Sequence, residues 1–373
     1  MILINITVVL LVLYALLIIA YWIGWRMIPT FKMQTKWEQY NNQFSIIVPA
    51  RNEEHSILAC LQSLTSQSYS AKHFQIIVVN DHSTDKTQQV VEAFIAQYPT
   101  HQVSLINMSD EGPKHQLKKA AITYAIKKAT GKFIVLTDAD CTRGTNWLNT
   151  INQFLNATHS KFVYAPVEFK ANTVFEKIQA LEFAGLVGIG ASAIQLKNPN
   201  MCSAANLIFD KEVFFEVDGY TGNDGLASGD DEFLLHKVFK VYPNNTQFLK
   251  HTDATVYTTA NASVQQLAQQ RKRWVSKSTK YDNRYITAIL VGAYLFNASI
   301  LILLIVNPIA GLCVLTGKTL VEALFLGDVM RFFKHKSYLL FLPLAELFHI
   351  IYVLIIGIWA NVGTYTWKER DLK

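Results

Sequence analysis

The stretch Phe133–Asp140 reads FIVLTDAD: four consecutive apolar residues are followed by a threonine and then by two aspartates separated by one alanine. A short, continuous apolar run that ends in polar residues is typical of a strand buried on both faces, as in a parallel sheet. Two earlier runs have the same form, FSIIV at Phe44–Val48 and FQIIVV at Phe74–Val79. Helical patterns separate these runs, at 53–67, 86–97 and 114–129. The sequence therefore predicts an α/β domain with a mostly parallel mixed sheet and helices on both faces.

Polar residues follow each of these runs. Asp138 and Asp140 follow the FIVL run, Asn80–Asp85 follows the second run, and Pro49–Glu54 follows the first. In such sheets, ligands bind beyond the carboxyl ends of the strands. Neighbouring carboxylates repel each other unless a cation lies between them, and their oxygens suit Mg²⁺ or Mn²⁺ shared with substrate phosphates. Taken singly, each motif also fits a solvated turn or a helix cap.

The composition points to a membrane. Of the 373 residues, 51% are hydrophobic and only 17% are charged, against about 25% charged residues in ordinary soluble domains. Segments 1–25 and 285–317 contain no charged residue, and 338–360 contains one acid, Glu346. Since a bilayer core needs roughly 20 apolar residues per helix, each segment can span it. A purely soluble enzyme is excluded.

The first apolar segment fits a retained anchor better than a cleaved signal peptide. Its apolar core, Ile2–Ile23, is longer than the roughly 7–15 residues of a signal core. Positive residues follow it, at Arg26, Lys32 and Lys36. The positive-inside bias places residue 30 onward in the cytoplasm.

The cysteine spacing and the net charge argue against a zinc site, a disulfide framework and a nucleic-acid partner. Cys60, Cys141, Cys202 and Cys313 lie far apart without a C-x-x-C pair, so that neither a zinc site nor a disulfide framework is indicated. Scattered thiols fit a reducing compartment. The net charge of +6 comes without a recognisable nucleic-acid module, and we expect no nucleic-acid partner.

Segment 261–284 joins basic residues to apolar ones directly before the second uncharged segment. Its basic residues are Arg271, Lys272, Arg273, Lys277, Lys280 and Arg284. Together with Trp274 they indicate an amphipathic helix in the membrane interface. For Arg271, Lys272 and Lys277 we expect side chains that snorkel to that interface.

Three ionisable residues fall within the expected spans. Lys318 and Glu322 have i,i+4 spacing and can pair on one helix face. Glu346 shares a face with His349, an arrangement that fits a helix–helix contact at least as well as a functional role.

Taken together, the motifs resemble those of the inverting family 2 glycosyltransferases, which have the Rossmann-like A-type glycosyltransferase fold. The matching residues are Pro49-Ala50-Arg51-Asn52-Glu53, Asp81-x-Ser83-x-Asp85, Lys118 before Gly131, Asp138-x-Asp140, Ser203-Ala204-Ala205-Asn206, Gly229-Asp230-Asp231, and Gln270-Arg271-Lys272-Arg273-Trp274. The last fits Q-x-x-R-W, the signature of membrane-embedded members such as cellulose, hyaluronan and ceramide-glucosylating enzymes. Two positions depart from the family pattern, with Leu117 in place of a glycine and Asp230 in place of a glutamate. The resemblance covers roughly residues 44–275.

The resemblance implies a role for each matched residue. The implied donor-binding residues are Ala50, Arg51, Glu53, Asp81, Lys118, Asp138, Gln270, Arg273 and Trp274. Asp140 would ligate Mg²⁺ or Mn²⁺, and Asp231 would be the general base. The alternative for Asp230 and Asp231 is a helix N-terminus that favours acids, and for Arg273 and Trp274 it is an interface belt.

The implied function is a membrane-bound inverting glycosyltransferase, which moves a sugar from a nucleotide sugar to a lipid or glycan acceptor. The resemblance favours UDP over GDP. The expected location is the bacterial inner membrane, with the catalytic domain facing the cytoplasm, as the positive-inside bias indicates. The alternatives are a processive polysaccharide synthase of the cellulose or hyaluronan type and a non-enzymatic membrane scaffold that binds nucleotide. The expected domains are an anchor at 1–28, a glycosyltransferase domain at 40–260, an interfacial helix at 261–284, and a transmembrane region at 285–373 with spans near 285–306, 308–327 and 338–360.

Overall fold

The computed structural model describes residues 1–34, 41–111, 118–222, 229–276, 284–359, 365–367 and 370–372. The chain divides into two compact units. The helical unit holds Met1–Met27, Phe169–Ser192 and Ala260–Lys373, and the sheet unit holds Ile28–Glu168 and Ala193–Thr259. This division differs from the expected linear plan because 169–192, inside the expected 40–260 domain, belongs to the helical unit. Residues 114–117 and 277–283 of two expected helices lie outside the described residues.

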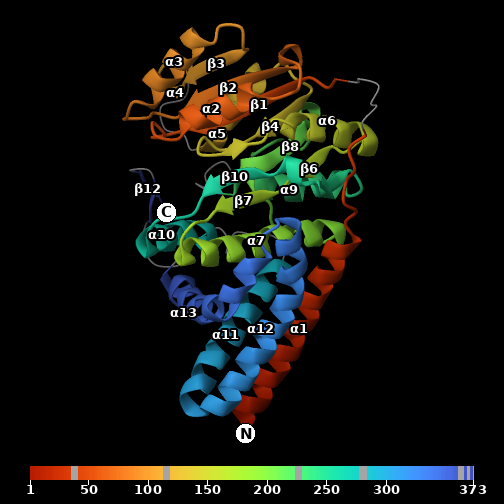
Figure 1. Ribbon diagram of the computed structural model, residues 1–373, viewed down its shortest axis with the longest axis vertical. Coiled ribbons are helices and arrows are strands. Elements are labelled where there is room, and N and C mark those ends of the chain that lie inside the picture. The colour runs from red at the N-terminus through yellow and green to blue at the C-terminus, as the bar shows by residue number, and fades with distance from the viewer. Residues whose placement is uncertain are drawn as a thin grey trace. The chain divides into compact units, whose positions relative to one another are not determined.

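The sheet unit is built on a seven-stranded sheet (Figure 1). Its strands are β1 (Phe44–Ala50), β2 (Phe74–Asn80), β3 (Val103–Asn107), β4 (Phe133–Leu136), β6 (Phe162–Tyr164), β8 (Leu207–Asp210) and β9 (Thr246–Phe248). They lie in the order β3-β2-β1-β4-β8-β6-β9. The first four run parallel, β8 is antiparallel to β4 and β6, and β9 is parallel to β6. The predicted mostly parallel mixed sheet is confirmed.

Helices and a smaller sheet complete this unit. The helices are α2 (Ile57–Thr65), α3 (Thr87–Gln97), α4 (Met108–Glu111), α5 (Lys118–Lys128), α6 (Trp147–Thr158), α8 (Lys211–Glu216) and α9 (Asp230–Val241), with short turns η1 (Ala71–His73), η2 (Ala204–Asn206) and η3 (Thr252–Ala254). The smaller sheet has the order β5-β10-β7, formed by Thr142–Arg143, Val256–Thr259 and Val167–Lys170. The last two residues of β7, Phe169 and Lys170, belong to the helical unit. Successive residues of a strand point to opposite faces. Because Ile46, Ile47 and Val48 of β1 are all fully buried, both faces of the main sheet are covered.

A close backbone contact fixes the start of β4 against β1. The Gly131 N–H donates a hydrogen bond to Ser45 Oγ at 2.8 Å. A Cβ atom at position 131 would lie 2.5 Å from the Phe44 carbonyl carbon and 2.6 Å from the Ser45 nitrogen. Only a residue without a side chain fits there.

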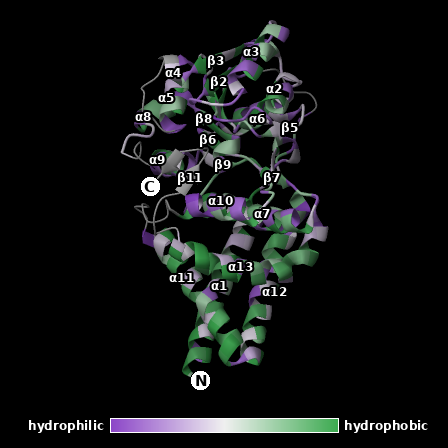
Figure 2. Ribbon diagram, turned by 90° about the vertical axis from the view of Figure 1, so that its left-hand side faces the viewer, coloured by the Kyte–Doolittle hydropathy of each residue, from purple (hydrophilic) through white to green (hydrophobic). Residues whose placement is uncertain are grey.

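The helical unit contains most of the long apolar helices. Its elements are α1 (Ile2–Met27), α7 (Val174–Gln195, within this unit up to Ser192), α10 (Val264–Ser276), α11 (Arg284–Val306), α12 (Pro308–Phe332), η5 (Lys336–Phe341) and α13 (Leu342–Trp359), followed by the short strands β11 (Tyr365–Trp367) and β12 (Arg370–Leu372). Five helical segments in the described residues are long and apolar enough to cross a membrane. Four of them fall at the expected positions: Ile2–Met27, Arg284–Val306, Pro308–Phe332 and Lys336–Trp359. Figure 2 shows that α1, α11 and α12 are apolar over most of their length.

The fifth segment, α7, was not predicted, because Glu176, Lys177 and Glu182 interrupt its apolar run. It differs from the other four in that 78% of its apolar window is buried. Gly185 and Gly188 bring α7 close to α12, where added Cβ atoms would lie 3.1 Å from Leu326 and 2.8 Å from Phe325. In both views α7 runs crosswise to α1 and α12 (Figures 1 and 2).

Buried charges join the helices of this unit. Lys318 Nζ lies 2.6 Å from Glu322 Oε1 and also pairs with Glu346 of α13. The Tyr14 hydroxyl of α1 donates to Glu322. The predicted pair of Lys318 with Glu322 is therefore confirmed, and Glu346 makes a helix–helix contact.

The close contact at Gly131 yields a stability prediction. Gly131→Ala should lower the free energy of unfolding of the sheet unit by about 1–3 kcal/mol, because the methyl group must push the backbone of β1 aside. The matched control is Gly144→Ala, since a Cβ atom there has nothing within 4 Å. Thermal unfolding of the purified full chain should show a lower midpoint for Gly131→Ala alone. Equal midpoints for the two variants would contradict the prediction.

Candidate active site

The carboxyl ends of β1 and β2 are joined by Arg51. Its guanidinium Nη1 donates to the backbone oxygens of Asp81 at 2.9 Å and His82 at 2.8 Å. The Asp81 N–H donates to the Ala50 oxygen at 2.8 Å, and Arg51 is only 8% exposed. Three of the expected donor-binding residues, Ala50, Arg51 and Asp81, are thus brought together.

The loops that follow these two strands interlock. The Glu53 N–H donates to Thr87 Oγ1 at 2.7 Å, and the Glu53 carboxylate accepts from Ser56 Oγ at 2.7 Å. Asp85 accepts from the backbone N–H of Thr87 and of Glu54, both at 3.0 Å. Asp85 therefore accepts from the first N–H of α3, one residue before the N-cap position Lys86.

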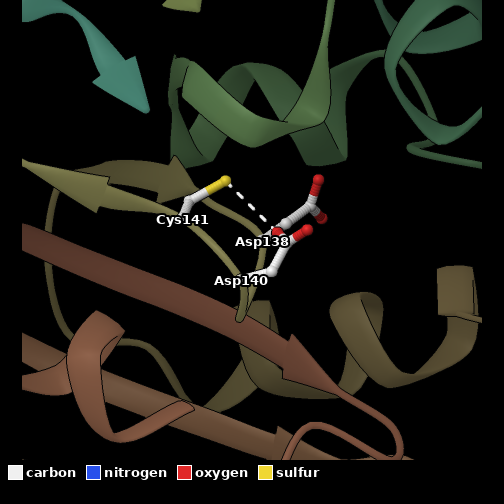
Figure 3. A group of neighbouring side chains, drawn as sticks. All are labelled: Asp138, Asp140 and Cys141. Atoms are coloured by element: carbon white, nitrogen blue, oxygen red, sulfur yellow. Dashed lines mark hydrogen bonds between the residues drawn. The ribbon is translucent and has the colours of Figure 1, made fainter. Parts of the chain in front are cut away.

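The two aspartates of the FIVLTDAD stretch lie side by side in the loop after β4 (Figure 3). Ligand atoms of Asp138, Asp140 and Cys141 all lie within 4.8 Å of one another. Asp138 Oδ1 accepts from Lys118 Nζ at 2.8 Å, whereas the Asp140 side chain is exposed. The same lysine nitrogen lies 3.4 Å from Asp230 Oδ2 at the start of α9. Lys118 therefore links two acidic segments that are far apart in the sequence.

Asp231 lies in the first turn of α9 and is half-buried. Its Oδ1 accepts from the Glu232 N–H at 2.9 Å, and its Oδ2 accepts from the Ala204 N–H at 3.2 Å. The Ser203–Asn206 segment is thus in contact with the expected base. The position also satisfies the alternative interpretation, because an acid in a first helical turn is favoured by the helix dipole.

Asn206 of this segment has a structural role. Its Nδ2 donates to the oxygens of Pro166 and Ala254, both at 2.7 Å, and its Oδ1 accepts from Trp147 Nε1 at 3.1 Å. The side chain is fully buried. It therefore holds three segments of the sheet unit together.

Gln270, Arg273 and Trp274 lie on α10 in the helical unit. Gln270 Oε1 accepts from Asn261 Nδ2 at 3.0 Å and from Arg271 Nη1 at 3.1 Å. The Trp274 ring lies 4.2 Å from the Arg271 Cζ atom. Arg273 is half-buried. That Gln270, Arg273 and Trp274 bind the donor stays a prediction.

The expectation that Arg271 and Lys272 snorkel is wrong. Arg271 is 3% exposed and its Nη2 lies 2.9 Å from Glu182 Oε2 on α7, while Glu182 also accepts from the Tyr352 hydroxyl. Lys272 is 2% exposed, with Nζ 4.4 Å from the centroid of the Trp359 ring. A buried ion pair satisfies the Arg271 charge. Nothing near Arg271 in the sequence signals this partner, because Glu182 lies in the helix that was not predicted.

The residues after β4 fit a hard divalent cation. Asp140 offers an exposed carboxylate beside Asp138, and Mg²⁺ or Mn²⁺ in such sites combines one or two carboxylates with water and phosphate oxygens. Burial raises the pKa of the Cys141 thiol well above its ordinary value, and the neighbouring Asp140 and Asp138 carboxylates raise it further. The thiol is therefore protonated and acts as a donor to Asp140 Oδ1, with a sulfur–oxygen distance of 3.4 Å. The ligand set is one of oxygens.

Comparisons with known proteins match this chain to glycosyltransferases. The family model described as glycosyl transferase family 2 matches residues 45–220. The chain is 32% identical over 198 residues to TarS of Staphylococcus aureus, a poly(ribitol-phosphate) β-N-acetylglucosaminyltransferase, across 53% of this chain and 32% of TarS. It is 29% identical over 125 residues to glycosyltransferase AglE of Haloferax volcanii, across 34% of this chain and 39% of AglE. The chain thus spans between about a third and two fifths of the length of these relatives.

A further relative and one solved structure match this chain over larger shares of their own length. A Methanococcus voltae transferase, whose name contains a dolichyl N-acetylglucosaminyl phosphate, is 26% identical over 219 residues, across 54% of this chain and 64% of that protein. The Pyrobaculum calidifontis mannosyltransferase PcManGT, solved with GDP-Man and Mn²⁺, superposes with a TM-score of 0.60 at 16% identity, over 94% of this chain and 99% of its own. At that identity the likeness shows the fold alone, the A-type glycosyltransferase fold.

Glu168 on β7 is a titratable group that sequence patterns did not single out. Burial raises its pKa from 4.5 to about 7. A carboxyl group with a raised pKa binds its proton more strongly in the folded protein. The contribution of Glu168 to the free energy of unfolding is therefore greatest below pH 4.5. It falls as the pH rises toward about 7 and then stays constant.

Glu168→Gln should remove this pH dependence. We expect the variant to match the parent chain at low pH and to unfold at a higher temperature than the parent above pH 7. Thermal midpoints measured from pH 4 to pH 8 test this, with Glu92→Gln on the exposed face of α3 as the matched control. A constant difference between Glu168→Gln and the parent across this range would contradict the assigned titration.

Proposed function

We propose that this chain, which belongs to glycosyl transferase family 2 through its residues 45–220, transfers a sugar from a nucleotide sugar to a membrane-associated acceptor with inversion at the anomeric carbon. The observation that carries the proposal is the position of Lys118 between Asp138 and Asp230. The Lys118 ammonium group connects the Asp138–Asp140 pair to the Asp230–Asp231 pair. Inverting transfer needs a site for a charged diphosphate next to a base for the acceptor, and these two pairs supply both.

The donor would bind at the carboxyl ends of β1, β2 and β4. Ala50, Arg51, Glu53 and Asp81 form the interlocked loops there, and we assign them the nucleoside. In this assignment Lys118 binds the diphosphate through its charge, and Asp138 binds the ribose or the diphosphate. UDP is the proposed nucleotide, on the strength of the family resemblance.

Asp140 is the proposed ligand of Mg²⁺ or Mn²⁺. It is the exposed member of the pair, whereas Asp138 already accepts from Lys118. When bound, such an ion would neutralise the charge that develops on the leaving diphosphate. The Mn²⁺ in the solved structure of PcManGT supports this assignment.

Asp231 is the proposed general base. One backbone N–H is bonded to each of its oxygens, so that the carboxylate has a fixed direction and keeps further lone pairs for a proton. The acceptor oxygen forms a bond to the anomeric carbon while the bond from that carbon to the diphosphate oxygen breaks. The diphosphate leaves with the electron pair, and the hydroxyl proton passes to Asp231.

A lipid acceptor agrees with the helical unit. Its apolar helices expose large hydrophobic side chains such as Val9, Leu13, Ile305 and Ile309, which fits a bilayer. We propose that Gln270, Arg273 and Trp274 of α10 contribute to the diphosphate and acceptor end of the site. The proposed location is the bacterial inner membrane, with the sheet unit in the cytoplasm. The name of the Methanococcus voltae relative, which includes a dolichyl-linked sugar, supports a lipid acceptor.

Asp231→Asn should reduce transfer by roughly 100-fold to 10,000-fold, because an amide cannot accept the acceptor proton. Donor binding should persist, since Asp231 is not among the residues assigned to the donor. Transfer is measured with labelled donor on purified chain in lipid, and binding by titration with the nucleotide. The control is Asp253→Asn, an exposed acid of η3. Undiminished transfer by Asp231→Asn would refute the assignment of the base.

Washed membranes that contain the chain should convert one labelled nucleotide sugar into a lipid-soluble product that bears a single sugar. The assay uses a panel of UDP- and GDP-sugars with Mg²⁺ or Mn²⁺, followed by separation of lipid-soluble from polymeric material. A polymeric product would instead favour the processive synthase. Nucleotide binding without any product would favour the scaffold.

A further inference from the structure

We propose that Thr258 of β10 is a positioning residue that fixes the direction of the Asp140 carboxylate for a divalent cation. This inference rests on the proposed function, in which Asp140 binds the ion. No sequence motif includes Thr258, which lies 118 residues after Asp140.

Each oxygen of Asp140 has a donor from the sheet unit. Thr258 Oγ1 donates to Oδ2 at 3.1 Å, and the Cys141 thiol donates to Oδ1 at 3.4 Å. Thr258 is 9% exposed, whereas Asp140 is exposed. A buried hydroxyl therefore holds a carboxylate that would otherwise rotate freely in water. Because each carboxylate oxygen can accept more than one bond, Asp140 keeps lone pairs for a metal ion.

The pairing of β10 with β5 explains how Thr258 reaches this loop. The two strands are antiparallel, with Val256 opposite Arg143 and Tyr257 opposite Thr142. The same register places Thr258 next to Cys141, at the end of the loop that carries Asp140. Since β5 begins directly after that loop, the pairing of two short strands sets the distance between Thr258 and Asp140.

The backbone of the loop is fixed separately. Arg143 Nη2 donates to Thr137 Oγ1 at 2.8 Å and to the Cys141 oxygen at 3.0 Å, and the Arg143 Cζ lies 5.1 Å from the centroid of the Trp147 ring. The guanidinium thus ties both ends of the loop together. With the backbone held in this way, the Asp140 side chain is the part that Thr258 still has to orient.

The chemistry of the donor matters for a metal site. A lysine on a carboxylate brings a positive charge that competes with a metal ion, as Lys118 does on Asp138. A hydroxyl orients the carboxylate without adding a positive charge that competes with the cation. Partners that orient metal-binding side chains typically change metal affinity by roughly 10-fold to 100-fold when removed.

The test is the affinity for Mn²⁺, which does not depend on turnover. Free Mn²⁺ is followed by electron paramagnetic resonance while the full chain in detergent is titrated, with UDP present and, separately, with GDP. Thr258→Val keeps the shape of the side chain and removes the hydroxyl, and we expect it to raise the Kd for Mn²⁺ by about 10-fold or more. Thr258→Ser restores the hydroxyl and should stay close to the parent value.

The matched control is Thr259→Val, the same change at the next residue, which is exposed. A Kd for Thr258→Val equal to that of Thr259→Val overturns the proposal, provided that Asp140→Asn weakens Mn²⁺ binding. If Asp140→Asn binds Mn²⁺ as the parent does, the metal assignment of the proposed function fails and this inference fails with it. Thermal unfolding confirms that each variant is folded, and Thr258→Ala replaces Thr258→Val if the valine variant is not.

Discussion

The ammonium group of Lys118 reduces the electrostatic repulsion between the carboxylates around it. Asp138 and Asp230 both carry negative charge, and like charges that lie close together repel each other. Lys118 lies 2.8 Å from the first and 3.4 Å from the second and offsets much of that repulsion. Asp140 and Asp231 add two further carboxylates to the segments that Lys118 links. A divalent cation at Asp140, as proposed above, would add positive charge to this cluster of carboxylates.

The sequence predicted those parts of the fold and site that depend on neighbouring residues. The apolar runs that became β1, β2 and β4 were recognisable because both faces of each strand are buried, and Asp138 and Asp140 were recognisable because they follow such a run directly. Arg271 and Thr258 were not, since their partners Glu182 and Asp140 lie 89 and 118 residues away. A lone threonine in a short strand carries no local signal. Likewise, α7 was missed because three charged side chains interrupt its apolar pattern, although tertiary contacts bury it.

The buried charges of the helical unit act as cross-links between helices. Arg271 joins α10 to α7, and Lys318 joins α12 to α13 through Glu346. Removal of one member of a buried pair leaves the other charge without compensation, at a cost of about 3–5 kcal/mol. A shift of one helix along its axis would separate these partners. The stability of these pairs therefore depends on how the helices align.

The division of the chain between two units has a consequence for biosynthesis. The polypeptide passes from one unit to the other at four points, after residues 27, 168, 192 and 259. On the ribosome, Glu182 emerges 89 residues before Arg271 and 170 residues before Tyr352. The nascent α7 is therefore an apolar helix with an uncompensated acid until the last third of the chain has been translated. The final packing of α7, in which Glu182 pairs with Arg271 and accepts from Tyr352, therefore forms only after these C-terminal helices have been made.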